Sequence, residues 1–463
     1  MKSLVKVKLF FYNKLSLFLT LSILLVYLIL FFRFSFSIPR YVFLSSTVEP
    51  LTFSYNPETR FLADNDNVGF QPDKTTLKHI MFGIAASSSL WHKRKSYIEL
   101  WWKPRDMRGF VWLDKTTPVD NNNNTQIDSQ LMHPPIRISS ETYGFKYTRR
   151  GGHRSAIRIS RIVSETVRLG LADVRWYVMG DDDTFFVAEN LVRVLEKLDH
   201  DQFYYVGGNS ESHDQNIRFS YNMAYGGGGF AISHALAKAL AKMQDGCIKR
   251  HPALYGSDDR IHACMAELGV PVTKHAGFHQ FDVYGSLFGL LTAHPVTSLV
   301  SLHHLDIVAP IFPKADRVQA LRRLTVAMRL DSAALMQHSI CYDKAHNWTV
   351  SVSWGYAVQI FSTIKSARVM EMPARTFKNW YRNYHRGGYA FNTRSFGRNQ
   401  CQKPAIYYLF DAVLNEELHR TGTEYLPHPV FGNPWCETRK DREDPAVLVD
   451  RVEVHKTPDP QLW

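Results

Sequence analysis

The apolar positions of the chain form one long run first and short alternating patterns afterwards. Residues 15–32 read LSLFLTLSILLVYLILFF, without a charged residue in eighteen positions. A helix of this length nearly spans the hydrocarbon core of a bilayer, and tilt absorbs the difference. Four lysines lie before the run and two arginines follow it closely. The positive-inside rule therefore predicts a cytoplasmic tail at 1–14, a transmembrane signal-anchor at 15–32 and a lumenal body.

A cleaved signal peptide is the alternative to this anchor. Its apolar region is usually shorter and ends at small residues. Here Phe34, Phe36 and Ile38 occupy the place where cleavage would occur, which favours an uncleaved anchor. Residues 33–75 contain several prolines and show no sustained period, so we interpret them as a stem.

Residues 76–310 alternate between short apolar runs and segments of helical period. The pattern predicts strands at 79–85, 109–113, 176–179 and 203–206, and helices at 90–102, 153–169, 189–198 and 261–268. This order predicts an α/β fold, with a mostly parallel sheet covered by helices on both faces. Ligands of such sheets bind beyond the carboxyl ends of the strands. Beyond 310 the sequence becomes aromatic, basic and rich in turns, so residues 311–463 are predicted to form an additional C-terminal region with β character.

The charge balance narrows the class of ligand. The chain has a formal net charge of +12, but its basic residues are scattered and no nucleic-acid motif accompanies them. Nucleic acid is therefore not an expected partner. Anionic small ligands, including nucleotide diphosphates, are the expected ones.

Cysteines and glycosylation sequons agree with a lumenal body. The five cysteines show no Cys-x-x-Cys spacing, so neither a zinc site nor a thioredoxin motif is indicated. In an oxidising compartment the simplest expectation is two disulfides and one free thiol. Cys247 with Cys264 is the first candidate pair, because the two are near each other and flank a candidate site. Asn123 and Asn347 begin acceptor sequons for N-glycosylation.

Three adjacent carboxylates, Asp181, Asp182 and Asp183, stand between the apolar runs WYVM and FFV. A solvated acidic turn is the ordinary explanation for such a run, but here both flanks must be buried. Adjacent anions raise one another's pKa unless a cation offsets the repulsion. Hard carboxylate oxygens suit Mn²⁺ or Mg²⁺, which keep coordination positions open for phosphate oxygens. The triplet therefore predicts a metal site that binds a nucleotide-sugar diphosphate.

The segment RWYVMGDDDTFFV resembles the metal-binding segment of Fringe and its relatives in glycosyltransferase family 31, which have the GT-A fold. Four more segments resemble family motifs in the expected order: SSSLWHKRKSYIELWW at 87–102, YGGGGF at 225–230, SDD at 257–259 and HHLD at 303–306. Gly228 departs slightly from the family, which often has alanine or threonine there. The motifs cover about half of the chain. Over its whole length the sequence is most similar to plant Fringe-related proteins that carry a C-terminal domain of unknown function.

The resemblance assigns roles to the motif residues. It implies that Asp183 ligates Mn²⁺ while Asp181 and Asp182 hold the ion and the nucleotide. It also implies that His304 completes the metal site, with His303 as a less favoured substitute; either histidine could instead be an ordinary buried residue. Donor-binding residues implied by resemblance and topology are Arg94, Asp114, Asp182, Gly227 and Gly228.

The second acidic motif supplies the candidate catalytic base. Inverting transfer needs one carboxylate to accept the proton of the attacking hydroxyl. Asp258 and Asp259 precede a helical pattern, where an aspartate can also cap the helix. One can cap while the other acts as base; Asp259 is the first choice for the base, and Asp258 stays open.

The expected function is a metal-dependent inverting glycosyltransferase with Mn²⁺ or Mg²⁺ as cofactor. It would transfer a hexose or N-acetylhexosamine from a UDP-sugar to a hydroxyl of a glycan, glycoprotein or small glycoside, with a β-1,3 link. Two alternatives are a glycosidase, which also uses two carboxylates but no metal, and a catalytically silent lumenal protein that binds carbohydrate or nucleotide-sugar with the same fold. The expected location is the Golgi membrane, in single-pass type II orientation.

The orientation can be tested directly. Protease added to sealed Golgi vesicles should spare the chain beyond residue 32, because the membrane would separate it from the enzyme. Removal of N-glycans should increase the electrophoretic mobility of the protein. Digestion of the body in sealed vesicles would overturn the orientation; digestion only after detergent treatment is the matched control.

Overall fold

The structure is a computed structural model that describes residues 22–26, 74–117, 132–381, 388–397, 402–428, 444–459 and 462–463. The chain divides into two units, residues 1–71 and 72–463. In the first unit residues 22–26 are helical, and the rest of the predicted anchor lies outside the described residues. Within the described ranges, no helix has the length and apolar character that crossing a membrane requires.

A seven-stranded sheet forms the centre of the second unit. Its strand order is β3-β2-β1-β4-β7-β6-β8, with bounds Ile136–Ile138, Arg108–Leu113, Ile80–Ala85, Trp176–Asp181, Phe230–Ser233, Tyr205–Gly207 and Val272–Lys274. β3, β2, β1 and β4 are parallel, whereas β7 is antiparallel to both of its neighbours. The sheet is thus rich in parallel pairs, as the alternating pattern predicted, and mixed because of β7.

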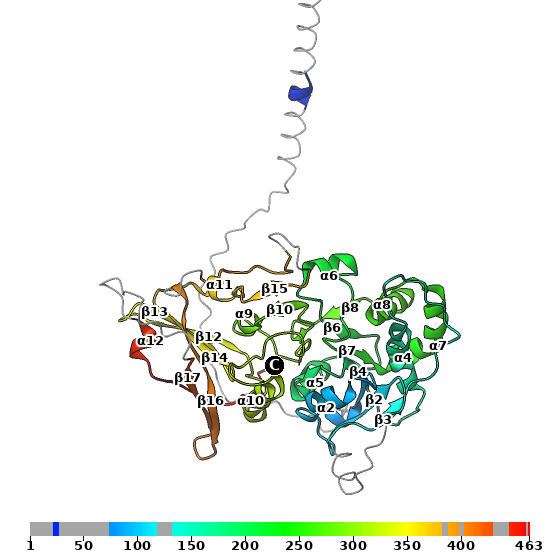
Figure 1. The fold of residues 1–463 in the computed structure, drawn as a ribbon, viewed down its shortest axis with the longest axis horizontal. Helices are drawn as coiled ribbons and strands as arrows, with labels where there is room; N and C mark the ends of the chain where they lie inside the picture. Colours follow the sequence, from blue (N-terminus) through cyan, green and yellow to red (C-terminus); the bar gives the residue numbers. More distant parts are fainter. Residues whose placement is uncertain are drawn as a thin grey trace, which may run out of the picture. The chain divides into compact units, whose positions relative to one another are not determined.

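Each face of this sheet has its own apolar core, because successive side chains of a strand point to opposite faces. In β1, Met81 and Ala85 belong to one core and Phe82 and Ile84 to the other. The first core lies under α4 (Ser155–Val167), α7 (His234–Arg250) and α8 (Ser257–Glu267), which pack against one another (Figure 1). The second core is covered by α2 (Trp91–Glu99) and α5 (Ala188–Leu195).

The C-terminal region forms a six-stranded antiparallel sheet, in agreement with the predicted β character. The order β12-β13-β14-β16-β17-β18 has bounds His338–Asp343, Trp348–Ser353, Ala357–Phe361, Ala405–Asn415, Arg420–Pro427 and Val452–Lys456. α10 (Arg317–Leu330) packs against β16. Apolar residues of this sheet and of α10 belong to the same core as α2 and α5, so the core is continuous across residue 310.

The second unit also contains shorter elements. They are η1 (Leu77–His79), β5 (Phe185–Phe186), α6 (His213–Arg218), β9 (Phe278–His279), β10 (Val283–Gly285), α9 (Phe288–Leu291), β11 (Ser301–Leu302), α11 (Ala367–Met370), β15 (Phe377–Asn379) and α12 (Pro445–Leu448). β11 lies between β5 and β9, and β15 pairs with β10. These pairings join segments that are far apart in sequence.

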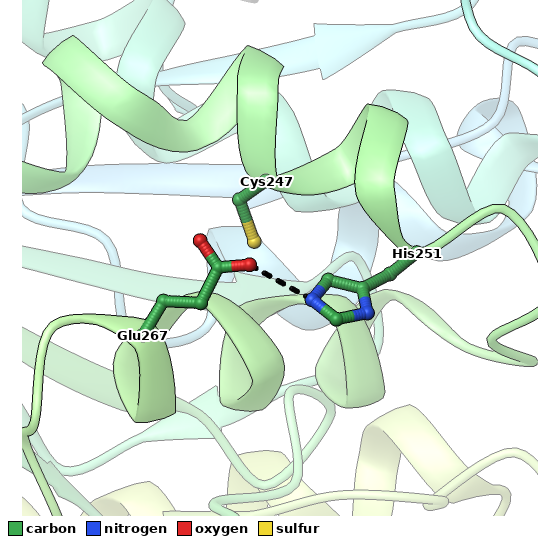
Figure 2. Close-up of side chains that lie close together, drawn as sticks. All are labelled: Cys247, His251 and Glu267. Carbon is green, nitrogen blue, oxygen red and sulfur yellow. Dashed lines mark hydrogen bonds and ion pairs between the residues drawn. The ribbon is translucent and has the colours of Figure 1, made fainter.

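One predicted disulfide is present, between Cys247 on α7 and Cys264 on α8. His251 and Glu267 lie beside Cys247 and form an ion pair of 2.9 Å (Figure 2). Cys247 is already bonded to Cys264, so this cluster is a cross-link between two helices and not a thiolate metal site. Cys341 is free and exposed, while Cys401 and Cys436 lie outside the described residues.

Breaking the cross-link should destabilise the fold. We expect the double substitution Cys247→Ala with Cys264→Ala to lower the free energy of unfolding by about 2–4 kcal/mol, since the unfolded chain regains the freedom that the closed loop removes. Urea denaturation of the full chain in detergent measures the loss. Cys341→Ala, at an exposed free thiol, is the control and should change stability by less than about 0.5 kcal/mol. Equal midpoints for parent and double variant would contradict a stabilising cross-link.

Candidate functional site

The acidic triplet occupies the turn that ends β4. Asp181 is the last residue of the strand, and the carboxylates of Asp182 and Asp183 are buried, with residue exposures of 2% and 0%. Thr184 fixes this turn: its hydroxyl accepts from the Asp181 N–H at 2.8 Å and donates to the Gly227 carbonyl at 2.7 Å. The triplet is therefore part of the buried frame and not a solvated surface turn.

Arg94 of α2 provides the first cation that stabilises the triplet. Its Nη1 donates to Asp182 Oδ1 at 2.8 Å and lies 3.5 Å from Asp183 Oδ1, and its Nη2 donates to Asp306. Burial alone would lower the pKa of Arg94. The charges of Asp183 and Asp182 outweigh this effect and raise the pKa above its usual value, so the guanidinium stays charged. Arg94 was predicted to bind the donor, and the structure places it beside the acids of the triplet.

His303, which follows β11, provides the second cation. Its Nε2 lies 3.3 Å from Asp183 Oδ1 and 3.7 Å from Asp181 Oδ2. Burial would lower the pKa of His303, but the charge of Asp183 and its hydrogen bond raise it to about 9. Burial would likewise raise the pKa of Asp183, yet His303 and Arg94 hold it well below its usual value. Burial raises the pKa of Asp182 to about 6 despite the opposing effect of Arg94.

The donor atoms fit a hard divalent ion. One carboxylate oxygen each of Asp181 and Asp183 and one nitrogen of His303 lie within 4.8 Å of one another. Asp182 Oδ2 and Asp183 Oδ2 are buried without a hydrogen-bond partner, and leaving a buried anionic oxygen unpaired is costly. Carboxylate oxygens with one imidazole suit Mn²⁺ or Mg²⁺. The residues present therefore fit the predicted metal.

His304 lies apart from the acidic triplet. Its Nδ1 is 3.2 Å from Asp282 Oδ1, and its ring stacks on that of Trp380 with centroids 4.7 Å apart. Its φ of 54° lies in the left-handed region. Its ring lies beside that of His303, with centroids 4.1 Å apart, but among the described ion pairs only His303 contacts the acids of the triplet. The geometry thus places His303, the less favoured of the two in the sequence prediction, against the acids.

The glycine loop at 226–229 passes between the two acidic motifs. A Cβ on Gly227 would lie 2.0 Å from Cε1 of His303, so only glycine fits there without moving that ring. Gly229 has a φ of 82°, which also favours glycine. The loop is fixed: the Gly228 N–H donates to Gln280 Oε1 at 2.6 Å, and Ser301 Oγ donates to the Gly228 carbonyl. Gly227 and Gly228 therefore lie beside the triplet, as the resemblance implied.

Asp258 and Asp259 face different surroundings at the start of α8. Asp258 lines a small cavity together with Asp181 and Gly226, and burial raises its pKa despite hydrogen bonds from Gly226 and Ser257. Asp259 Oδ2 instead accepts from the Tyr255 N–H at 3.4 Å, at the helix N-terminus. The geometry favours Asp258 over Asp259 as the group that shares a space with the metal site.

Asp114 lies at the edge of this arrangement. It is exposed just after β2, and its Oδ1 accepts from the Ser88 N–H at 2.7 Å. Burial would raise the pKa of Asp114, but the hydrogen bonds from Ser88 lower it overall. Asp114 thus holds the turn before α2, which carries Arg94, and it contacts no residue of the triplet by a described hydrogen bond or ion pair.

Some residues of the site were not among the predicted site residues. Asp306 binds Arg94, and it stood in the quoted HHLD segment without a role. Asp282 binds His304, and Gln280 binds the glycine loop; single polar residues in HQFD gave no motif signal. Trp380 lies beyond the predicted catalytic region, and only the pairing of β15 with β10 reveals its place.

Comparison with known families agrees with this site. Residues 215–463, more than half of the chain, match the family described as "Protein of unknown function, DUF604". The chain belongs to this family. Residues 75–292 match the family described as "Fringe-like", and the two matches together confirm the resemblance to Fringe-related glycosyltransferases. No curated protein matches the chain.

Two solved structures of LgtC are similar to part of the chain. An active-site mutant of LgtC has 12% identity and a TM-score of 0.30, over 45% of this chain and 76% of that one. The galactosyltransferase LgtC in complex with donor and acceptor sugar analogs has 13% identity and a TM-score of 0.27, over the same shares. These likenesses are too distant to bear on individual residues of the site.

The tight fit of the glycine loop gives a testable prediction. Gly227→Ala should displace the ring of His303, and we therefore expect the affinity for UDP with Mn²⁺ to fall at least about tenfold, measured by titration calorimetry. Gly144→Ala is the matched control, because a Cβ there meets no atom within 4 Å. If Gly227→Ala bound as tightly as the parent, His303 would not be needed for the site. Thermal unfolding of both variants separates lost affinity from lost fold.

Proposed function

We propose that this chain is a metal-dependent inverting glycosyltransferase that transfers a hexose or N-acetylhexosamine from a UDP-sugar to an acceptor hydroxyl, with a β-1,3 link. The observation that carries the proposal is the cluster of Asp181, Asp183 and His303, in which the buried Asp183 Oδ2 has no hydrogen-bond partner. The Fringe-like match over residues 75–292 supports the same class of reaction. The linkage and the sugar follow from the family resemblance alone.

Different residues of the site would bind different parts of the donor. Asp181, Asp183 and His303 would hold the ion, and His303 would release its Nε2 proton to do so, because a metal-ligating imidazole is neutral. A bound divalent ion supplies positive charge that stabilises a diphosphate leaving group. Arg94 adds a fixed guanidinium beside the same acids, close enough to bind a donor phosphate oxygen. The glycine loop lets the backbone approach the sugar without a side chain between them.

Asp258 would act as the general base. In the transfer, the bond between the anomeric carbon and the diphosphate oxygen breaks, and UDP leaves with the electron pair. The acceptor oxygen forms the new bond to that carbon, and its proton passes to a carboxylate oxygen of Asp258. A raised pKa improves a carboxylate as proton acceptor, and burial raises the pKa of Asp258.

The proposed location is the Golgi lumen, with the chain anchored by residues 15–32. The disulfide between Cys247 and Cys264 supports an oxidising compartment. The sequon at Asn347 lies at an exposed turn between β12 and β13, where a glycan can be attached. The other sequon, at Asn123, lies outside the described residues.

Three amide substitutions test the division of roles. Asp258→Asn should lower kcat about 10²–10⁴-fold with donor affinity kept, because an amide cannot accept the proton. Asp183→Asn should lose affinity for UDP with Mn²⁺, since a neutral amide is a poor ligand for a hard ion. Asp259→Asn is the matched control and should keep most turnover. Mn²⁺-dependent UDP release and titration calorimetry measure both properties.

Two outcomes would contradict the proposal. UDP binding by the parent without any turnover of UDP-glucose, UDP-galactose or UDP-N-acetylglucosamine would indicate a silent binding protein. A loss of turnover in Asp259→Asn but not in Asp258→Asn would exchange the two roles.

A further inference from the structure

A cavity of about 830 Å³ lies between β9, the segment after α9 and parts of the C-terminal region that include β12. Phe278, Leu290 and Phe391 are among the apolar side chains of its wall. The described residues that line it include none of the acidic triplet, the glycine loop or Asp258. The cavity is therefore separate from the candidate catalytic centre, and the histidines that line it need an explanation of their own.

Two of these histidines, His279 and His294, lie against each other. Their ring centroids are 5.0 Å apart, and the residues are only 8% and 4% exposed. Among the residues that the structure describes, neither His279 Nε2 nor His294 Nε2 has a hydrogen-bond partner. Leaving two buried ring nitrogens unpaired is costly, so a ligand that binds both would stabilise this part of the fold.

The other nitrogen of each ring is fixed by an oxygen. His279 Nδ1 lies 3.0 Å from Glu211 Oε1, and His294 Nδ1 lies 2.8 Å from the Pro295 carbonyl oxygen. A carbonyl oxygen can only accept, so His294 carries its proton on Nδ1, and Nε2 of the neutral ring carries the lone pair. Histidines that bind a metal through one nitrogen almost always donate the other N–H to a carboxylate, a backbone carbonyl or water. The two rings show two of these arrangements.

The protonation of the two rings suits a metal ion. Burial lowers the pKa of His279 to about 4 and that of His294 well below its usual value, so both rings are neutral near pH 7, as metal binding requires. Burial raises the pKa of Glu211 to about 8 despite a hydrogen bond from the Phe281 N–H. Glu211 and His279 then hold two protons together. An ion on His279 Nε2 would release one of them and leave the other between Nδ1 and the carboxylate.

The spacing of the rings fits a tetrahedral ion. A zinc–imidazole bond is about 2.0–2.1 Å long, so two imidazoles on one tetrahedral zinc ion have ring centres about 5 Å apart. The rings of His279 and His294 have this separation. Imidazole nitrogens suit Zn²⁺, whereas carboxylate and water oxygens suit Mg²⁺ and Mn²⁺. The pair therefore selects a different metal from the one that fits the acidic triplet, and the cavity has room for water or a small anion at the remaining positions of the ion.

We propose that His279 and His294 bind a zinc ion through their Nε2 atoms, with Glu211 positioning the ring of His279. The ion would join β9 to the segment after α9, beside the C-terminal region. This inference does not rest on the proposed function, because zinc binding can be measured without donor, acceptor or turnover.

The test measures zinc uptake by the full chain in detergent. The protein is freed of metal with a chelator and equilibrated with Zn²⁺; mass spectrometry counts the bound ions and titration calorimetry gives the affinity. We expect His279→Asn and His294→Asn each to hold one zinc ion fewer than the parent, or to bind it at least about tenfold more weakly. The asparagine amide removes the ligand nitrogen but can still donate to Glu211 or to the Pro295 carbonyl. Asp183→Asn should keep this ion.

His275→Asn is the matched control. His275 lines the same cavity, but both of its ring nitrogens have partners: Nδ1 accepts from the Gly277 N–H at 3.2 Å, and Nε2 lies 3.2 Å from Thr297 Oγ1. This variant should bind zinc as the parent does. Thermal unfolding without metal shows which variants keep the fold. X-ray absorption at the zinc edge of Asp183→Asn needs neither ligand variant, and it should show two imidazole nitrogens at about 2.0–2.1 Å.

Three outcomes would overturn the zinc site. They are equal zinc binding by the parent and both ligand variants, an equal loss in the His275→Asn control, and a zinc ion with oxygen ligands alone in the absorption spectrum. UDP with Mn²⁺ should bind His294→Asn as it binds the parent. Failure of the parent to bind UDP while the zinc results hold would instead reject the proposed function alone.

Discussion

Burial of two adjacent carboxylates, Asp182 and Asp183, directly after β4 is the constraint on which the rest of the site depends. Asp182 and Asp183 are almost completely excluded from solvent, so their charges must be offset by cations that lie in place. Arg94 from α2 and His303 after β11 provide them from two sides. The carboxylate oxygens left without partners then define where a further positive charge can bind.

The sequence allowed most of this frame to be predicted, because its signals are local. Apolar runs placed β1, β2 and β4 within two residues of their bounds, and the triplet followed from its position between buried flanks. Which of two consecutive residues of the same type belongs to the site could not be predicted in the same way. Consecutive residues of a helix point about 100° apart, so assigning Asp258 or Asp259 to the site requires the exact start of α8. For His303 and His304 the deciding feature is which of two adjacent rings contacts the acids, and this depends on packing that no sequence pattern indicates.

The role of residues beyond 310 had no local signal at all. β15 is three residues long and its partner β10 lies about ninety residues earlier. Such a pairing depends on the packing of both segments against the common core. The change in sequence pattern suggested a domain boundary at residue 310. This boundary separates Trp380 and Tyr381 from the residues that they contact.

The pairing of β15 with β10 also has a consequence for synthesis of the protein. A ribosome makes Arg94, the acids and both histidines long before it makes residues 377–381, and contacts between such distant segments form slowly. Until then Trp380 cannot stack on the rings of Tyr284 and His304. The group of aromatic residues around His304 is therefore complete only after residue 381 has been translated.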